Sequence, residues 1–246
     1  MAKRVVLVTG ASRGLGAELC LQYARAGWSV IAASRTGELA PTLTQESGLD
    51  VSAAKLDIVS PSDAAALAAD LDARGVAISL LVNNAGVALD RSANLADVDY
   101  DLWEESLKTN VLGAHRVTAA LLPALARSGP DFKIACLSSR LGSIGNTLAP
   151  LAYDLASTDV SYRTSKAAVN MAVACIAVEL RTKHPQAAVV ALCPGWVNTD
   201  MGSKGGKVKP PLEPPAVCEG LRKVIADVTA EATGSFINWQ SEAVPW

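Results

Sequence analysis

The sequence predicts an α/β fold, built as a doubly wound and largely parallel sheet of about seven strands with helices on both faces. Short apolar runs rich in β-branched residues, typical of strands buried on both faces, alternate with segments of helical periodicity. A glycine-rich turn joins the first of these runs to the first helical segment. No internal repeat or break in composition divides the 246 residues, so we expect a single domain spanning 1–246.

Composition argues against several classes of protein. Half of the residues are hydrophobic and 19% are charged, which supports a sizeable core and argues against disorder. The formal net charge of −2 gives no indication of a nucleic-acid partner or an anionic membrane. Five cysteines without CxxC spacing argue against a metal site and fit a reducing compartment. With no leader pattern and no apolar run of about 18 residues, we expect a cytoplasmic protein that contacts no membrane.

The first strand, 5–8, leads into the sequence TGASRGLG at 9–16, and apolar residues then recur at helical spacing. A glycine-rich turn between a buried strand and a helix start lets backbone N–H groups face a pyrophosphate. The stretch therefore predicts a dinucleotide-binding site. Its candidate residues are Gly10, Ser12, Arg13, Gly14, Leu15 and Gly16.

The end of the second strand, 28–33, indicates which cofactor is bound. An acidic residue there would bind the ribose 2′-hydroxyl of NAD, whereas arginine suits the 2′-phosphate of NADP. The residues present are Ser34, Arg35 and Thr36, with no acid. Arg13 in the glycine-rich turn can reach the same side. Two guanidinium groups and a hydroxyl can clamp a phosphate, which favours NADP(H), although either arginine could be a solvated loop charge.

The third strand, expected over 51–58, carries a polar candidate near its end. Asp57 could accept a hydrogen bond from an adenine amino group, with Ile58 beside it, or it could cap the local turn. A helix start follows, with Ser60 as the N-cap and Pro61 at the first helical position.

The fourth strand, 78–82, ends in the sequence NNAG at 83–86, which could hold a cofactor against the strand end. The asparagines could equally satisfy the backbone of a turn. The candidate residues are Asn83, Ala85 and Gly86. One long helical pattern follows over 99–122, and it contains Asn110, which would be costly if buried without partners.

The remaining chain continues the alternation of strands and helices. Strands are expected at 132–137, 187–192 and 234–239, and helices at 161–183 and 214–228. Within the first of these helices Tyr162 and Lys166 lie one turn apart on the same face. An ammonium lowers the pKa of a nearby tyrosine, so the pair can exchange a proton with a carbonyl or alcohol oxygen. The alternative is a packed ring beside a solvated amine.

Together these motifs resemble the short-chain dehydrogenase/reductase family. The shared features are TGASRGLG at 9–16, NNAG at 83–86, Asn110, Ser139, YRTSK at 162–166 and PGWVNTD at 194–200. They stand in the family order and cover essentially the whole chain. The stretch 194–201, the short loop after it and the tryptophan at 246 look most like the C-factor/sniffer-type carbonyl reductase branch. The resemblance implies a Rossmann-type fold.

The resemblance also implies a role for each matching residue. Tyr162 would be the general acid in reduction, while Lys166 would lower its pKa and hold the nicotinamide ribose hydroxyls. Ser139, preferred over Ser138 for its spacing to the following glycine, would orient the substrate carbonyl. Asn110 would hold a water in a proton relay to the lysine. The nicotinamide would be lined by Pro194, Gly195, Val197 and Thr199.

The implied function is the NADPH-dependent reduction of a small ketone or aldehyde to an alcohol, with no metal. One alternative is a dinucleotide-binding signalling protein of C-factor type. Another is a 3-oxoacyl thioester reductase, for which Lys204, Lys207 and Lys209 could supply a basic patch. We expect the long apolar segment 143–161 to wall the active site, unless it is a surface loop or a subunit contact, and 200–215 to be the substrate loop. The two long helices would pair subunits in a homodimer or homotetramer.

Overall fold

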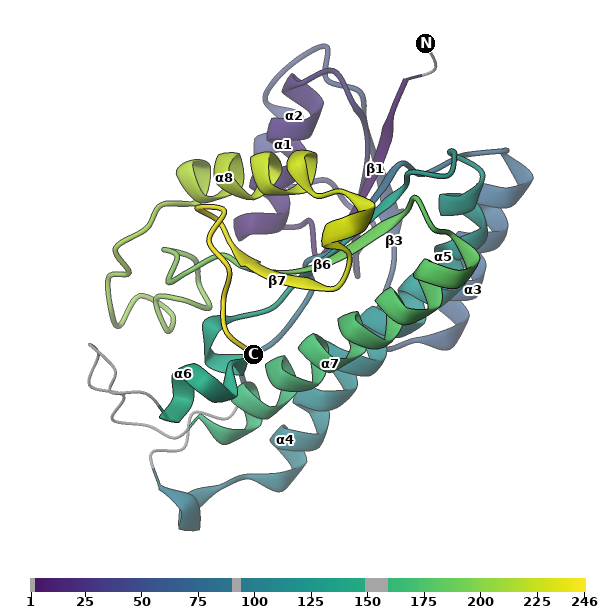
Figure 1. Cartoon of the computed structure of the whole chain (residues 1–246). Helices are drawn as coiled ribbons and strands as arrows, with labels where there is room; N and C mark the ends of the chain where they lie inside the picture. The colour runs from purple at the N-terminus through teal and green to yellow at the C-terminus, as the bar shows by residue number, and fades with distance from the viewer. Residues whose placement is uncertain (1–2, 90–93, 149–158) are drawn as a thin grey trace.

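The computed structural model describes residues 3–89, 94–148 and 159–246, and it confirms the predicted fold class. The strands form one parallel sheet in the middle of the molecule (Figure 1). Its strand order is β3-β2-β1-β4-β5-β6-β7. The strands are β1 Val5–Thr9, β2 Ser29–Ser34, β3 Val51–Lys55, β4 Leu80–Asn83, β5 Lys133–Leu137, β6 Ala188–Cys193 and β7 Ser235–Asn238. The strand order reverses at β1, which lies between β2 and β4, so ligands are expected beyond the carboxyl ends of β1 and β4.

Helices cover both faces of this sheet (Figure 1). One face carries α1 Gly14–Arg25, α2 Pro41–Thr44 and α8 Pro214–Asp227; the other carries α3 Pro61–Ala73, α4 Tyr100–Leu107, α5 Ala114–Ala126 and α7 Val160–Lys183. The short helix α6 Ile144–Leu148 follows β5, and 3₁₀ turns span Leu95–Asp97, Arg140–Gly142 and Ala230–Ala232. Val6 and Val8 of β1 pack into the core of the first face and Leu7 into that of the second. This two-sided burial explains why the strands are apolar throughout.

The helix expected over 99–122 is confirmed as an unbroken helical path from Tyr100 to Ala126, but its middle turn is π-helical rather than α-helical. Helix α4 ends at Leu107, a π-helical turn occupies Lys108–Gly113, and α5 continues to Ala126. A π turn inserts one residue into a helical turn, which apolar periodicity does not reveal, and such turns are frequent at functional sites. Here it contains Asn110.

The strand expected over 51–58 ends earlier, at Lys55. Asp57 turns the chain, because its Oδ1 accepts a hydrogen bond from Val59 N–H at 3.1 Å. The helix start that follows is confirmed, since the side chain of Ser60 accepts a hydrogen bond from Asp63 N–H at 3.1 Å.

Within the three described ranges, no helix combines the length and apolarity needed to cross a membrane. The π turn and α7 expose three large apolar side chains, those of Leu112, Met171 and Val178. Pairing of subunits through these helices stays a prediction.

Candidate active site

The glycine-rich turn between β1 and α1 is packed too closely for side chains at two positions. A Cβ atom on Gly10, whose φ is +66°, would lie 2.8 Å from Ala85 Cα. A Cβ atom on Gly16 would lie 2.3 Å from Gly10 O. Helix α1 then begins at Gly14 with no side chain capping its first N–H groups. A glycine-lined helix start with uncapped N–H groups fits a pyrophosphate, and Ser12 and Leu15 flank it, exposed and half-buried respectively.

Thr9 and Asn84 fix this turn to the end of β4. Thr9 Oγ1 accepts hydrogen bonds of 3.1 Å from the N–H groups of Asn84 and Ala85, and Asn84 Nδ2 donates to Thr9 O at 2.8 Å. The expected support of turn backbone is therefore confirmed for Asn84. Asn83 is buried, and its Nδ2 donates to Thr118 Oγ1 at 2.9 Å. The side chain of Asn83 thus points toward α5, and a contact of Asn83 with a cofactor stays a prediction.

The turn after β2 places Ser34 and Arg35 beyond the carboxyl end of the strand. The hydroxyl of Ser34 is buried and accepts a hydrogen bond from Gly37 N–H at 3.1 Å, so it closes the turn. Arg35 is exposed beside it. The guanidinium of Arg35 and the backbone of the turn are therefore the exposed donors at this end, with the Ser34 hydroxyl in a supporting role, and the binding of a phosphate there stays a prediction.

Asp57 and Ile58 follow β3. The turn-capping alternative for Asp57 is confirmed by its bond to Val59, while contact with an adenine stays a prediction. Ile58 is buried, and its Cδ1 would lie 2.9 Å from a Cβ atom on Gly113. The chain after β3 is thereby held against the π turn.

The segment after β6 stands opposite the glycine-rich turn. A Cβ atom on Gly14 would lie 3.5 Å from Thr199 Cγ2. Arg13 Nη1 donates to Asp200 Oδ2 at 2.5 Å, with both side chains exposed. Gly195 adopts a φ of +79°, a conformation that favours glycine. Of the other predicted positions in this segment, Pro194 is half-buried and Val197 is buried.

Lys166 and Tyr162 lie one turn apart on α7, as predicted. Lys166 is only 6% exposed, its Nζ lies 5.6 Å from the centroid of the Tyr162 ring, and it donates to Leu137 O at 2.7 Å. Burial lowers the pKa of Lys166 from 10.5 to about 8, partly opposed by the thiols of Cys136 and Cys193. At neutral pH the site therefore holds a buried ammonium beside a half-buried tyrosine.

Asn110 connects the π turn to this pair. Its Oδ1 accepts a hydrogen bond from Val87 N–H at 2.7 Å, and its Nδ2 donates to Val87 O and to Ser165 Oγ, both at 2.9 Å. Ser165 Oγ in turn donates to Tyr162 O at 2.8 Å. A Cβ atom on Gly86 would lie 3.0 Å from Asn110 Oδ1 and 3.6 Å from Lys166 Nζ, so all these groups meet at one point. Both amide donors of Asn110 are thus engaged within the protein.

The two serines after β5 have different environments. Ser138 is buried, and its Oγ donates to Asn170 Oδ1 at 2.5 Å. Ser139 is partly exposed, and its Oγ accepts a hydrogen bond from Leu141 N–H at 3.2 Å. Among the described residues nothing accepts the hydroxyl proton of Ser139, which can therefore be donated to a ligand. A Cβ atom on Gly142 would lie 2.6 Å from the Lys166 carbonyl carbon, so the serine turn is pressed against α7.

The sequence matches the family described as short chain dehydrogenase over residues 4–208. The chain belongs to the short-chain dehydrogenase family. C-signal of Myxococcus xanthus is 39% identical over 170 residues, covering 69% of this chain and 93% of that protein. The structure of an NADPH-bound carbonyl reductase from chicken fatty liver superimposes with a TM-score of 0.85 at 29% identity, covering all of both chains. The structure of carbonyl reductase Sniffer of D. melanogaster superimposes with a TM-score of 0.84 at 27% identity, again covering all of both chains.

The short-chain dehydrogenase site contains three polar residues that were not predicted. Ser165 and Asn170 lie on the buried face of α7. Polar residues on an otherwise apolar helix face are a pattern in the sequence that could have indicated them. Asp200 carries a charge opposite to that of Arg13, but nothing in the sequence indicates that the two meet. Among the residues that the structure describes, no three His, Cys, Asp or Glu side chains lie close enough to hold a metal ion. Most of the predicted wall 143–161 lies outside the described residues.

Replacing Asn110 by alanine should cost this short-chain dehydrogenase both stability and activity. The N–H and C=O of Val87 would each lose a buried partner, and each such loss costs about 1–3 kcal/mol. We expect the free energy of unfolding in urea to fall by about 2–4 kcal/mol. Asn94→Ala is the matched control, because Asn94 is exposed and its side chain, among the described residues, bonds to Asp97 alone, at 2.8 Å. Equal stability of the two variants would contradict the anchoring role of Asn110.

Proposed function

We propose that the chain is an NADPH-dependent oxidoreductase that reduces the carbonyl of a ketone or aldehyde to an alcohol. The observation that carries this proposal is the buried ammonium of Lys166 beside the ring of Tyr162. Burying a charge is costly, and an ammonium held beside a phenol can stabilise the phenolate that remains after a proton is donated. The available hydroxyl of Ser139 and the similarity to an NADPH-bound carbonyl reductase add support.

In this proposal the protein supplies the proton and the geometry of the reaction. The cofactor, when bound, supplies a hydride to the carbonyl carbon. Tyr162 donates its hydroxyl proton to the carbonyl oxygen, and the ammonium of Lys166 stabilises the phenolate that remains. Ser139 donates a hydrogen bond to the same oxygen and fixes its position. Asn110 would hold a water that returns the proton, using its main-chain carbonyl or the remaining lone pair of Oδ1, because both amide donors are engaged.

The preference for NADP(H) over NAD(H) rests on the charges around the turn after β2. No acid stands at 34–36 to bind a ribose 2′-hydroxyl, and Arg35 is exposed there. Arg13 uses its Nη1 for Asp200, and a guanidinium has further donors that could meet a phosphate. Both arginines would therefore face the 2′-phosphate.

Replacing either Arg13 or Arg35 by alanine should raise the KM for NADPH by about ten-fold and leave the KM for NADH nearly unchanged. A charge-assisted hydrogen bond is worth about 1.5–3 kcal/mol, reduced here by exposure of the arginines. Asp200→Asn is the control, because it removes the ion pair of Arg13 but keeps the guanidinium. An equal rise of the KM for NADPH and of the KM for NADH would show that the arginines do not bind the 2′-phosphate.

The proposed function is tested by following oxidation of NADPH and NADH in parallel against a panel of ketones, aldehydes and quinones. We expect turnover of at least one carbonyl compound, with NADPH preferred. Faster turnover with NADH would overturn the cofactor assignment but not the catalytic one. Tight NADPH binding without turnover of any compound would contradict the proposed reductase activity.

A second candidate is a signalling protein that binds the dinucleotide without needing turnover, which the 39% identity to C-signal supports. The variant Tyr162→Phe separates the two candidates. Signalling by binding alone would survive this change, whereas signalling that depends on reduction would be lost with catalysis.

A further inference from the structure

A cleft of about 440 Å³ opens between the segment after β4 and the loop after β6. Its lining residues are Ala88, Asp200, Met201, Lys204, Gly205 and Lys207. Ala88 directly follows Val87, whose backbone is held by Asn110 beside the catalytic pair. The opposite wall starts directly after Thr199, which faces the glycine-rich turn. Both walls of the cleft are therefore continuous in sequence with segments that lie at the Tyr162–Lys166 pair and at the glycine-rich turn, and its volume suits a small organic molecule.

The charged side chains of this cleft are unbalanced toward positive. Its lining includes two lysines, Lys204 and Lys207, and one acid, Asp200. The negative charge of Asp200 is compensated by Arg13, because Asp200 Oδ2 and Arg13 Nη1 form an ion pair at 2.5 Å. Neither lysine forms an ion pair with any acid that the structure describes. Two ammonium groups without an acidic partner among the described residues thus line this cleft, where they attract anions.

The backbone holds one of these lysines in a conformation that L-residues rarely adopt. Lys204 has a φ of +53° although it is not glycine. The turn is fixed by Gly205 N–H donating to Asp200 O at 2.9 Å and Gly206 N–H donating to Ser203 Oγ at 3.0 Å. Ser203 itself is buried, and its N–H donates to Thr199 O at 2.8 Å. Left-handed non-glycine residues concentrate at binding and catalytic sites, where the surrounding structure holds them in place.

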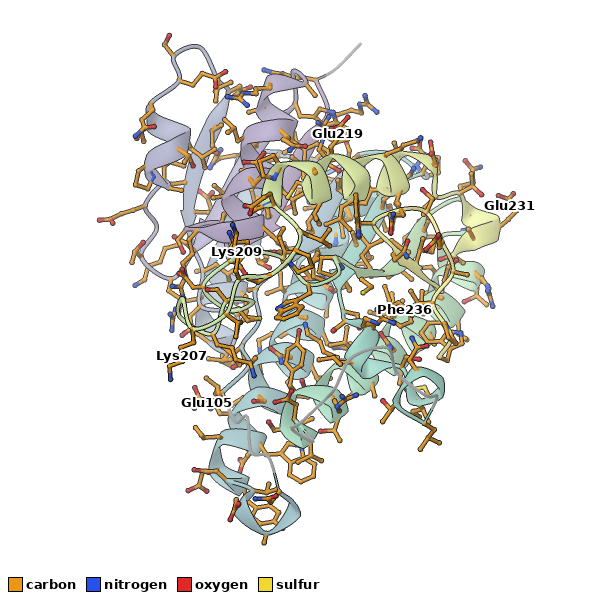
Figure 2. All side chains as sticks on the ribbon, turned by 90° about the vertical axis from the view of Figure 1, so that its left-hand side faces the viewer. Glu105, Lys207, Lys209, Glu219, Glu231 and Phe236 are labelled. Atoms are coloured by element: carbon orange, nitrogen blue, oxygen red, sulfur yellow. The ribbon has the colours of Figure 1, made fainter. Side chains whose placement is uncertain are left out.

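We infer that this cleft is the substrate subsite and that Lys204 and Lys207 select carbonyl compounds carrying a second, anionic group, such as a carboxylate or a phosphate. The inference rests on the proposed function, because it places the carbonyl at Tyr162 and the anion at the lysines. Lys209 lies on the same loop but does not line the cleft. Figure 2 shows Lys207 and Lys209 at different points of this loop with their side chains directed apart.

The test compares 4-formylbenzoate with its methyl ester, which carry the same aldehyde and differ in the anion. We expect the wild-type protein to have the higher kcat/KM for the acid. In Lys204→Ala/Lys207→Ala the ratio of acid to ester should fall by about ten-fold or more, with the ester unchanged. Lys209→Ala should keep the wild-type ratio. Raising the ionic strength should lower kcat/KM for the acid alone.

The anion bound by the lysines could instead be a phosphate of the cofactor, so the Kd of NADPH is measured for each variant. A raised Kd for NADPH, with acid and ester affected equally, would overturn the inference. An unchanged ratio of acid to ester would also overturn it, while turnover of the ester would leave the proposed function standing. If the protein turns over neither aldehyde and no member of the carbonyl panel, both the proposed function and the inference are contradicted.

Discussion

Replacing Tyr162 by phenylalanine is expected to lower kcat by about 10²–10⁴-fold, the usual contribution of a positioned general acid. The variant loses one hydroxyl and keeps the ring that lies 5.6 Å from Lys166 Nζ. The fold and the dinucleotide site should therefore be intact. We expect the Kd of NADPH to stay within about three-fold of the wild-type value, because the ring packing is retained.

The matched control is Tyr100→Phe, since Tyr100 is 72% exposed at the start of α4 and stacks on Trp103. This variant should keep wild-type kcat. The two variants are compared by initial rates of NADPH oxidation with the best carbonyl substrate. A kcat for Tyr162→Phe within about three-fold of wild type, where a general acid contributes far more, would contradict the assignment of Tyr162 as the proton donor.

Replacing Lys166 by methionine is expected to slow turnover strongly and yet to spare the fold. The side chain is buried, and the fold must keep its ammonium out of water, which costs about 3 kcal/mol for a pKa lowered from 10.5 to about 8. Methionine fills a similar volume without that cost, although Leu137 O loses its 2.7 Å partner. Without the ammonium the phenolate of Tyr162 is no longer stabilised, so the proton transfer slows.

The pH dependence of unfolding tests the burial of this charge independently of activity. Between about pH 8 and 10.5 the unfolded chain binds more protons at Lys166 than the folded chain does, so rising pH stabilises the wild-type protein. The methionine variant lacks this contribution. We expect the free energy of unfolding of the wild type to gain about 2 kcal/mol relative to Lys166→Met between pH 7 and pH 10. A parallel pH dependence of the two proteins in urea unfolding would show that Lys166 is not buried as a charged group.

Much of the fold could be predicted, because buried parallel strands and amphipathic helices leave distinct periods in the sequence. The position of Tyr162 beside Lys166 could be predicted for a similar reason, since a spacing of four residues on one helix fixes the relation of the two side chains before any tertiary structure is known. The glycine-rich turn could also be predicted from its local sequence. Gly10 and Gly16 stand where no side chain fits, and the strand–turn–helix context indicates why.

Other features depend on contacts between distant segments and left no local signal. The π turn around Asn110 keeps the apolar pattern of an ordinary helix, so its hydrogen bonds to Val87 and Ser165 appear only in the structure. Asn83 and Asn84 are adjacent in sequence, and only tertiary packing sends one into the core and the other to the glycine-rich turn. The Arg13–Asp200 pair joins loops that are 187 residues apart.

The most direct test of the central claim is to follow the hydride itself. NADPH stereospecifically deuterated at C4 is incubated with the protein and its best carbonyl substrate, once for each face of the nicotinamide, and the alcohol is analysed by mass spectrometry. A reductase built on Tyr162 and Lys166 predicts one deuterium on the carbinol carbon of the product from one of the two labelled cofactors. Alcohol that carries no deuterium from either cofactor, or no alcohol at all while NADPH stays bound, would contradict it.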